Sequence, residues 1–380
     1  MIREQVAPRP DWQDKVEARG LIWHTGDGKP YWDEGTYYRF DRIEVDLIEG
    51  ATAELYRLFL EAGQAVIDDP QGLKIFGIPD YCHAAIRKAW NDEPPALNFG
   101  RFDLGYDGTG APKLFEFNCD TPTSLLEAAV IQWDWKQEVF RQSDQYNSLH
   151  ERLVGKWADL RTLIPDRLVH FAHVADAVGE DTVTVAYLRD TAEEAGLKTK
   201  AIAIDDIGWD GTRHMFVDLD ERAMTTIFKL YPWEWLTNEQ FGRNLIDSLD
   251  TTIWMEPIWK MIWSNKAILP VLWSMFPNHP NLLPASYSPM AGNVVTKPAL
   301  AREGANVAIH RDATMIAASS GAYDGSQIIY QALYELPETA PGCFPVLGSW
   351  IVDGAPAGMG IREDGLITGN TARFVPHVIG

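Results

Sequence analysis

Apolar and polar residues alternate in two runs between Asn98 and Glu127, and a turn with two glycines at residues 107–110 separates the runs. Alternation with a period of two is typical of β-strands, and glycine adopts the positive φ of a tight turn at little steric cost. We therefore predict a β-hairpin. Its apolar face is expected to hold Phe102, Leu104, Phe115 and Phe117, with Leu114 apart from them, and its polar face Arg101, Asp103, Glu116 and Asn118.

The polar face of this hairpin carries groups that can do chemistry. Asp103, Glu116 and Asn118 offer two carboxylates and an amide oxygen, which are hard ligands suited to Mg²⁺ bound to phosphates. The guanidinium of Arg101 beside them offers a planar fork of donors for an anion. A solvated hairpin without a ligand is the alternative, and this stretch alone leaves both open.

The segment Cys119–Ser124 follows the hairpin and precedes a helical run from Leu125. Its hydroxyl groups and its carboxylate suit a helix N-terminus, where free backbone N–H groups bind anions. The segment therefore either caps the helix or contributes to a binding site.

Helical spacing of apolar residues recurs elsewhere in the chain. The predicted helices are Trp12–Arg19, Ile43–Ile67 (as one helix or two), Tyr81–Trp90, Ala128–Leu160, Phe241–Leu249, Thr252–Trp263 and Ala267–Phe276. Between the first two lies a turn-rich aromatic segment that we expect to pack as a cap, with contact to a substrate as the alternative. Its aromatic residues are Tyr31, Trp32, Tyr37, Tyr38 and Phe40.

A strand–loop–helix–strand pattern over residues 168–204 predicts a βαβ unit of a parallel sheet, followed by a further strand from Met224. Ligands bind beyond the carboxyl ends of such strands, and the loop Asp176–Asp181 follows the first strand. Glu180 and Asp181 in this loop could hold an ammonium group or could cap the helix at Thr184–Ala195.

Two lysines in the second half lie at predicted element boundaries, Lys266 before a helix and Lys297 at the end of a strand. The loop Arg302–Gly304 follows and returns into a strand. Ammonium groups and a glycine loop that presents backbone N–H groups suit a phosphate tail. A strand at Ile328–Pro337 could present backbone groups to a purine edge, and a final hairpin spans residues 348–362. Each lysine alone is more simply a surface residue, but together with the hairpin they indicate nucleotide phosphates and Mg²⁺.

Composition narrows the class of protein. The 380 residues are 46% hydrophobic with 15 tryptophans, which indicates a well-packed globular enzyme of two or three lobes. A net charge of −21 argues against nucleic acid and anionic membranes as partners and would attract cations such as polyamines. Three scattered cysteines, an N-terminus without an apolar segment and the lack of a membrane-length apolar run lead us to expect a cytoplasmic protein with reduced thiols.

The ordered motifs RFD, EFNCDTPTS, SNK, KP, REGAN, YQALYELP and TARFVPH resemble the synthetase module of the glutathionylspermidine synthase family. The resemblance runs from about Phe99 to Val378. It implies an α/β fold of the ATP-grasp type, circularly permuted, because Lys266 and Lys297 come after the metal-ligand positions. It implies four sections: a helical cap at 1–97, a metal-binding hairpin with helices at 98–165, a small parallel α/β substrate lobe at 166–250, and a nucleotide-binding lobe with closing strands at 251–380.

The resemblance also implies roles for individual residues. Mg²⁺ would be held by Asp103, Glu116 and Asn118, ATP by Lys266, Lys297, Arg302, Gly304, Gln331 and Leu333, and substrates by Thr121, Thr123, Ser124, Glu180 and Asp181. Asp181 stands where the family pattern has a glutamate. Arg101 would face the developing acyl phosphate, Arg302 belongs to the mobile loop over the phosphates, and Arg373 matches a second anion-binding arginine.

The implied activity is an ATP-dependent carboxylate–amine ligase that forms an amide through an acyl phosphate, from a glutathione-like peptide and a polyamine or another acid and amine. We expect a stand-alone synthetase-like relative, because the chain has no room for the amidase domain of the bifunctional members. A non-catalytic ATP-binding protein is the alternative. A glycoside hydrolase with Asp103 and Glu116 as its carboxylates would leave Lys266 and Lys297 without a role.

Overall fold

The computed structural model describes residues 1–26, 28–174, 179–323 and 325–380, and a five-stranded antiparallel sheet lies at its centre. The strand order is β20 (Arg373–Val375), β19 (Ala355–Asp364), β18 (Phe344–Val352), β5 (Gly100–Gly105) and β6 (Lys113–Asn118). The two predicted hairpins are thereby confirmed, as β5–β6 and β18–β19. Because β18 pairs with β5, segments far apart in the sequence share this sheet.

A β-bulge in the β5–β6 pair changes the predicted faces of the hairpin. The register shifts between residues 103 and 104, so Phe115 is the extra residue on β6. Leu114 and Phe117 are buried in the core, whereas Phe115 lines a cavity on the polar side. The expectation that Phe115 and Phe117 share the apolar face is therefore wrong, because a simple alternation does not register a bulge.

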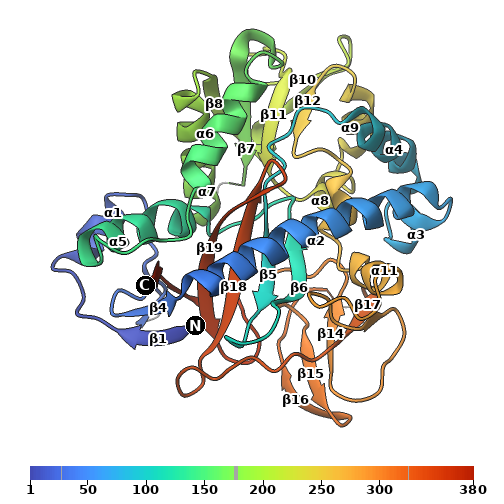
Figure 1. Cartoon of the computed structure of the whole chain (residues 1–380). Coiled ribbons are helices and arrows are strands. Elements are labelled where there is room, and N and C mark those ends of the chain that lie inside the picture. Colours follow the sequence, from blue (N-terminus) through green and yellow to red (C-terminus); the bar gives the residue numbers. More distant parts are fainter. Residues whose placement is uncertain (27, 175–178, 324) are drawn as a thin grey trace.

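The long helix α2 (Arg42–Asp68) crosses the central sheet (Figure 1). A capping box between Asp41 and Glu44 starts it, and its apolar positions face the sheet. The ring of Phe59 lies edge-on to Phe102 and Phe117, with centroids 5.5 and 5.1 Å apart. The helix expected at residues 43–67 is thus a single one.

The rest of the N-terminal section surrounds this helix. Its helices are α1 (Trp12–Glu17), α3 (Gly72–Ile75), η1 (Asp80–Cys82) and α4 (His83–Asp92), and a short β-ribbon joins β2 (Thr25–Gly26) to β3 (Lys29–Pro30). A three-stranded sheet combines β1 (Ile2–Gln5), β4 (Thr36–Phe40) and β21 (His377–Ile379). This pairing brings the two ends of the chain close together (Figure 1).

A four-stranded parallel sheet forms a second layer, with the order β12 (Ile253–Met255), β11 (Thr226–Leu230), β7 (Leu168–His173) and β8 (Lys198–Ala203). Helix α7 (Glu180–Glu194) connects β7 to β8, which confirms the predicted βαβ unit. Residues 175–178 of the predicted acidic loop lie outside the described residues. Around this sheet are η3 (Pro165–Arg167), η4 (Ile204–Asp206), β9 (Gly208–Asp210), β10 (Met215–Val217), α8 (Trp233–Leu236) and α9 (Gly242–Ser248).

Two predicted helices differ from the structure. The run Ala128–Leu160 is broken into a π-helical turn, η2 (Glu127–Ile131), then α5 (Gln132–Val139) and α6 (Leu149–Leu160). The run Thr252–Trp263 begins with the strand β12 and ends with the short helix α10 (Lys260–Trp263). A short apolar run fits a buried strand as well as a helix, and pairing with β11 decides for the strand.

A second five-stranded antiparallel sheet, called the third sheet below, lies beside the central one (Figure 1). Its order is β13 (Ala285–Ser286), β17 (Ile328–Ala332), β14 (Val294–Pro298), β15 (Ala308–Arg311) and β16 (Thr314–Ala318), and α11 (Ile268–Met275) packs near β13 and β17. The structure thus confirms a mixed α/β fold that includes a helical N-terminal section and a parallel sheet.

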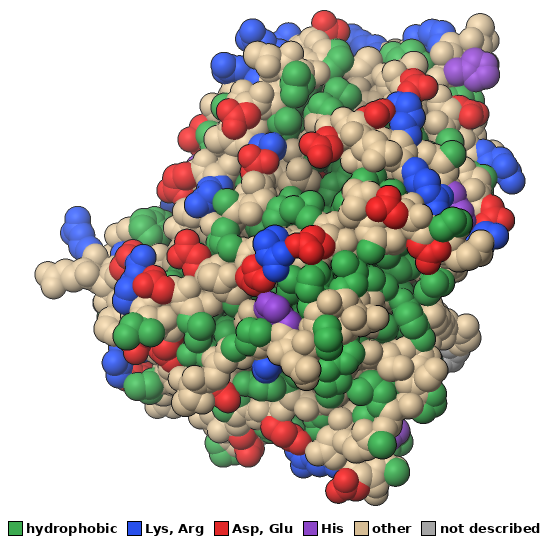
Figure 2. All heavy atoms as spheres, turned by 45° about the vertical axis from the view of Figure 1, so that its right-hand side comes forward, with side chains coloured by type: hydrophobic (Ala, Val, Ile, Leu, Met, Phe, Trp, Pro, Cys, Tyr) green, Lys and Arg blue, Asp and Glu red, His purple; other side chains and the backbone are tan. Residues whose placement is uncertain are grey.

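Charged side chains of both signs are interspersed with hydrophobic ones on the face shown in Figure 2. Within the part of the chain that the structure describes, no helix has the length and apolar character needed to cross a bilayer. Despite the net charge of −21, the acidic side chains do not form one continuous surface on the face shown in Figure 2.

Candidate active site

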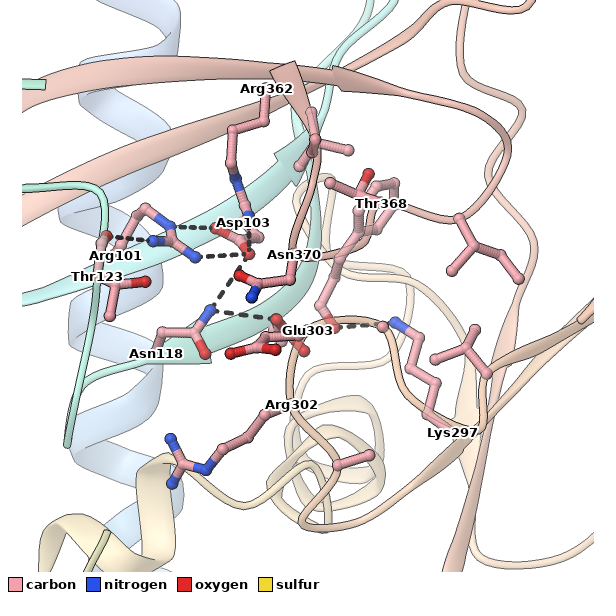
Figure 3. Close-up of a pocket in the computed structure, with 18 of the residues that line it drawn as sticks. Arg101, Asp103, Asn118, Thr123, Lys297, Arg302, Glu303, Arg362, Thr368 and Asn370 are labelled. Carbon is pink, nitrogen blue, oxygen red and sulfur yellow. Dashed lines mark hydrogen bonds and ion pairs between the residues drawn. The ribbon is translucent and has the colours of Figure 1, made fainter. Parts of the chain in front are cut away.

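A cavity of about 270 Å³ opens where the central sheet, the parallel sheet and the third sheet approach one another. Its walls come from β5 and β6, the segment after β6, the start of α7, the end of β11, strands β14 and β17, the loop at residues 301–304 and the loop after β19. Figure 3 shows arginines and a lysine from these elements around one common space. All predicted site residues except Arg373 line this cavity: Arg101, Asp103, Glu116, Asn118, Thr121, Thr123, Ser124, Glu180, Asp181, Lys266, Lys297, Arg302, Gly304, Gln331 and Leu333.

Two arginines hold the carboxylate of Asp103 in place. Arg101 donates through Nε to Oδ1 at 2.7 Å and through Nη2 to Oδ2 at 3.2 Å, while Nη1 donates to the carbonyl of Thr123 at 2.7 Å. Arg362 from β19 donates to Oδ2 of the same carboxylate at 2.7 Å (Figure 3). Nε of Arg362 is buried and has no partner among the described residues, so this arginine keeps a donor free for a ligand.

Lys266 and Lys297 contact the second strand of the hairpin, β6. Nζ of Lys266 lies 2.8 Å from Oε2 of Glu116, and Nζ of Lys297 donates to Oε1 of Gln331 at 2.7 Å and to the carbonyl of Phe115 at 3.2 Å. Gln331 in turn donates to the carbonyl of Leu114 at 2.9 Å. These contacts connect β6 of the central sheet to β14 and β17 of the third sheet.

The ionisation of these groups follows from their surroundings. Burial alone would raise the pKa of Glu116, but the ammonium groups of Lys266 and Lys297 lower it well below its usual range. Burial lowers the pKa of Lys297 to about 8, and Glu116 offsets part of this shift. Glu116 is therefore an anion at neutral pH, which disfavours the general-acid role that a glycoside hydrolase would require of one carboxylate.

The donor set at the hairpin fits a divalent cation. Oδ2 of Asp103 and Oε1 of Glu116 converge on Nδ2 of Asn118, at 3.2 and 3.1 Å. The oxygen and nitrogen of an amide exchange places when the group turns over, and Oδ1 of Asn118 would then join the two carboxylate oxygens. Three oxygen donors of this kind suit Mg²⁺. In the described ranges, no group of three or more His, Cys, Asp and Glu side chains could hold a metal ion, so this amide is needed to complete the set.

The loop at residues 301–304 reaches over the cavity. Arg302 donates through Nη1 to Oγ1 of Thr121 and through Nη2 to Oε1 of Glu234, both at 2.6 Å. Gly304 has φ +69°, and a Cβ there would lie 2.5 Å from the carbonyl oxygen of Thr368, so only glycine fits. Nε of Arg302 is buried without a partner among the described residues, which leaves it available to an anion.

A buried ion pair fixes the segment after β6. Nζ of Lys229 on β11 lies 2.5 Å from Oδ1 of Asp120, whose Oδ2 accepts the backbone N–H of Trp233 at 2.9 Å. Burial lowers the pKa of Lys229, and Asp120 counters that effect. This pair anchors Thr121, Thr123 and Ser124 between the hairpin and the parallel sheet. Lys229 and Glu234 lie in the strand and turn predicted from Met224, where the sequence offers them only as candidates, without a partner that would assign a role.

One end of the cavity is acidic. Glu180 at the start of α7 accepts a hydrogen bond from Thr123, and burial raises the pKa of its carboxyl. Asp181 and Glu303 also line this cavity. The side chains predicted to hold an ammonium group therefore lie in the same cavity as the phosphate and metal candidates.

Arg373 is placed differently from its predicted role. It lies outside the cavity, in an ion pair with Glu363 and with Nε 3.3 Å from Oδ2 of Asp33. The arginine that reaches the cavity from this region is Arg362, because residues alternate in direction along β19 and its neighbour Glu363 faces the other side. The predicted hairpin ends at Arg362, and extending its alternation by one residue would have placed Glu363 on the opposite face.

The family model described as "Glutathionylspermidine synthase preATP-grasp" matches residues 3–380 of this chain. The chain is 38% identical to a "Putative acid--amine ligase" of Haemophilus influenzae over 97% of each sequence. It is 30% identical to the trypanothione synthetase of Crithidia fasciculata and 27% identical to the bifunctional glutathionylspermidine synthetase/amidase of Escherichia coli, with 84% and 86% of this chain covered. It spans about half the length of these two, 53% and 56%.

Among solved structures, the fold is similar to that of a glutathione synthetase-like effector from Globodera pallida in its apo form. The TM-score is 0.60 at 11% sequence identity, with 97% of this chain and 95% of that chain covered. At this identity the likeness concerns the fold alone.

Proposed function

The chain belongs to the glutathionylspermidine synthase family, and from this premise we propose that it is an ATP-dependent ligase that joins a carboxylate to an amine. The observation that carries the proposal is the 2.8 Å contact between Lys266 and Glu116. It joins the oxygen-rich hairpin to a lysine from the distal half of the chain, so the groups that we propose for phosphate and for metal line one cavity.

We propose a circularly permuted ATP-grasp arrangement, with the lysines after the carboxylates in the sequence. The four sections 1–97, 98–165, 166–250 and 251–380 are part of this proposal. The central sheet combines β5 and β6 with β18–β20, so the second and fourth sections contribute strands to one sheet.

We propose that ATP lies along the third sheet. Gln331 and Leu333 would border the adenine, and Lys266 and Lys297 would contact the phosphates. A phosphate beside Lys297 would stabilise its ammonium form against the burial that lowers its pKa. Asp103, Glu116 and Asn118 would hold Mg²⁺, which when bound neutralises phosphate charge.

The arginines suit the charge that builds up as a carboxylate accepts the γ-phosphoryl group. Arg101 and Arg362 converge on Asp103, both line the cavity, and Nε of Arg362 has no partner among the described residues. Arg302 with Gly304 would cover the phosphates and exclude water, because an acyl phosphate exposed to water hydrolyses. An amine then displaces phosphate, and the products are an amide, ADP and phosphate.

The names of the relatives suggest the substrate class. We propose a peptide carboxylate, held near Thr121, Thr123 and Ser124, and a polyamine or similar amine near Glu180 and Asp181. A cationic amine complements the carboxylates at that end of the cavity. The non-catalytic alternative is not favoured, since the proposed phosphate and metal positions are all occupied by suitable side chains.

The test is ADP release from Mg-ATP with pairs of thiol peptides and polyamines. The proposal predicts that ADP, phosphate and amide form in equal amounts, and only when acid and amine are both present. Release of AMP and pyrophosphate would contradict the ADP-forming mechanism. Absence of turnover with every pair, despite tight Mg-ATP binding, would favour the non-catalytic alternative.

A further inference from the structure

Tyr31 extends from the N-terminal cap to the acidic end of the cavity. Tyr31 lines the cavity, and its hydroxyl lies 2.7 Å from Oε1 of Glu127 and 3.5 Å from Oγ of Ser124. Glu127 is 1% exposed and belongs to the π-helical turn η2. The other four aromatic residues of the cap, which do not line the cavity, are Trp32, Tyr37, Tyr38 and Phe40.

The hydrogen bond to Glu127 decides what the hydroxyl of Tyr31 can offer a ligand. A phenol has one proton, and an ionised carboxylate can only accept. With Glu127 ionised, the proton of Tyr31 points to Glu127, and its oxygen keeps a lone pair for a donor other than Ser124. With Glu127 protonated, the carboxyl group can donate to Tyr31, and the phenol is then free to donate into the cavity.

The surroundings make both arrangements accessible near neutral pH. Burial, and then the carboxylate of Glu180, raise the pKa of Glu127 to about 7, while Tyr31 and Arg101 act in the opposite direction. Burial also raises the pKa of Tyr31 well above its usual range, so its phenol stays protonated. Glu180, Tyr31 and Arg101, the charged and titratable groups with the largest effects on Glu127, come from three neighbouring segments.

We propose that Tyr31 is a binding residue for the amine substrate, and that Glu127 is a positioning residue that turns the phenol oxygen into an acceptor for the ammonium N–H. This inference rests on the proposed ligase function. Glu180 supplies negative charge at the same end of the cavity, and Tyr31 adds a directed acceptor. Ionisation of Glu127 therefore strengthens the binding of a cationic amine, and its protonation replaces the acceptor with a donor that an ammonium group cannot use.

The alternative is that Tyr31 only packs against the cap, where its ring lies 6.4 Å from that of Trp23. A packing role requires the ring but not the hydroxyl. The substitutions Tyr31→Phe and Glu127→Gln separate these roles, because both keep the shape of the side chain. Glu127→Gln introduces no packing defect, since glutamine has the shape of glutamate and its amide oxygen can still accept from Tyr31.

The chain offers a matched control pair. The hydroxyl of Tyr37 also donates to a carboxylate, that of Glu4, but neither residue lines the cavity. Tyr37→Phe and Glu4→Gln therefore remove the same kind of hydrogen bond elsewhere in the N-terminal section. Thermal unfolding of all four variants checks that each is folded.

The experiment measures the Kd of spermidine by calorimetry, with Mg-ADP present, from about pH 5.5 to about pH 8.5, which brackets the titration of Glu127. Wild-type protein is expected to bind spermidine more tightly as the pH rises through about 7. Tyr31→Phe should weaken binding by about tenfold to a hundredfold at high pH, as for a lost hydrogen bond to a charged group. Glu127→Gln should remove the pH-dependent step, and the control variants should behave as wild type.

Wild-type affinity in Tyr31→Phe at every pH would overturn the proposal, as would an unchanged pH profile in Glu127→Gln. Wild-type protein that binds no spermidine would also overturn it. The calorimetric readout needs no turnover, so it separates this proposal from the ligase activity. If an active pair is found, the KM for the amine should change in these variants while the KM for ATP does not.

Discussion

Nζ of Lys266 lies 2.8 Å from Oε2 of Glu116, although the two residues are 150 positions apart in the sequence. The contact joins the segment before α11 to strand β6 of the central sheet. The ammonium group of Lys266 is a main reason that the pKa of Glu116 is lowered despite burial. A change at either residue should therefore affect the other.

Lys266→Met should weaken Mg-ATP binding by about tenfold to a hundredfold, because the proposed charge-assisted contact to phosphate would be lost. Lys198→Met, at an exposed position on β8, is the control and should leave the affinity unchanged. Calorimetry of ATP binding makes the comparison. Equal affinity in the two variants would contradict the placement of the phosphates.

Arg101→Gln should lower kcat by about a hundredfold to a thousandfold, about 3–4 kcal/mol, if its guanidinium faces the charge that develops in the transition state. Arg373→Gln should leave kcat close to wild type and instead lower thermal stability, because Arg373 pairs with buried Glu363 outside the cavity. Steady-state kinetics with unfolding curves distinguish the two. A larger loss of kcat in Arg373→Gln would restore the role expected from the sequence.

Glu116→Gln should raise the Mg²⁺ concentration needed for half-maximal activity, since one anionic oxygen of the proposed donor set becomes neutral. Asp68→Asn, at an exposed position in the last turn of α2, is the control and should not shift this requirement. Titration of activity with Mg²⁺ at saturating ATP gives the answer. A Glu116→Gln enzyme with the wild-type Mg²⁺ requirement would exclude Glu116 as a ligand.

Gly304→Ala should displace the loop at residues 301–304, which we propose covers the phosphates, because its Cβ would lie 2.5 Å from the backbone oxygen of Thr368. We expect more ADP per amide formed, since a loop that closes poorly lets water reach the acyl phosphate. Gly292→Ala is the matched control: Gly292 also has a positive φ, but nothing lies within 4 Å of its added Cβ. The ratio of ADP to amide is the measurement, and the same ratio in both variants would argue against the lid role.

The folded protein should lose stability as Glu127 ionises. Its pKa is raised from 4.5 to about 7 by burial first and then by Glu180, so between these values the folded state binds more protons than the unfolded state. The free energy of unfolding should therefore fall as the pH rises through this window, by up to ~3 kcal/mol from this group. Glu127→Gln should lack that contribution. Denaturant unfolding at several pH values should show that its free energy of unfolding rises relative to that of wild type as the pH rises.

The sign is opposite for a carboxylate whose pKa is lowered. Hydrogen bonds from Arg39 and Tyr37 lower the pKa of Glu4, so its contribution is present at neutral pH and is lost as the pH falls. The free energy of unfolding of Glu4→Gln should therefore fall relative to that of wild type as the pH rises. A difference between Glu127→Gln and wild type that does not depend on pH would contradict the raised pKa.

The local pattern was enough to predict several elements. The β5–β6 hairpin, helix α2 and the β7–α7–β8 unit follow from periodicity and turn residues, which act between near neighbours in the chain. Segment Thr252–Trp263 was predicted wrongly, since β12 is a strand only because β11 is beside it. The bulge that turns Phe115 into the cavity likewise depends on the register with β5.

The sequence by itself determined the kinds of groups present: an oxygen-rich hairpin, two lysines at element boundaries and a glycine loop, in an order that resembles one family. Only the tertiary structure decided which of them meet. It placed Arg362 rather than Arg373 at the cavity, and it brought Tyr31 and Glu127 together across 96 positions. The physical reason is that periodicity reports which face of an element a residue occupies, whereas distance, burial and pKa depend on which other element packs against that face.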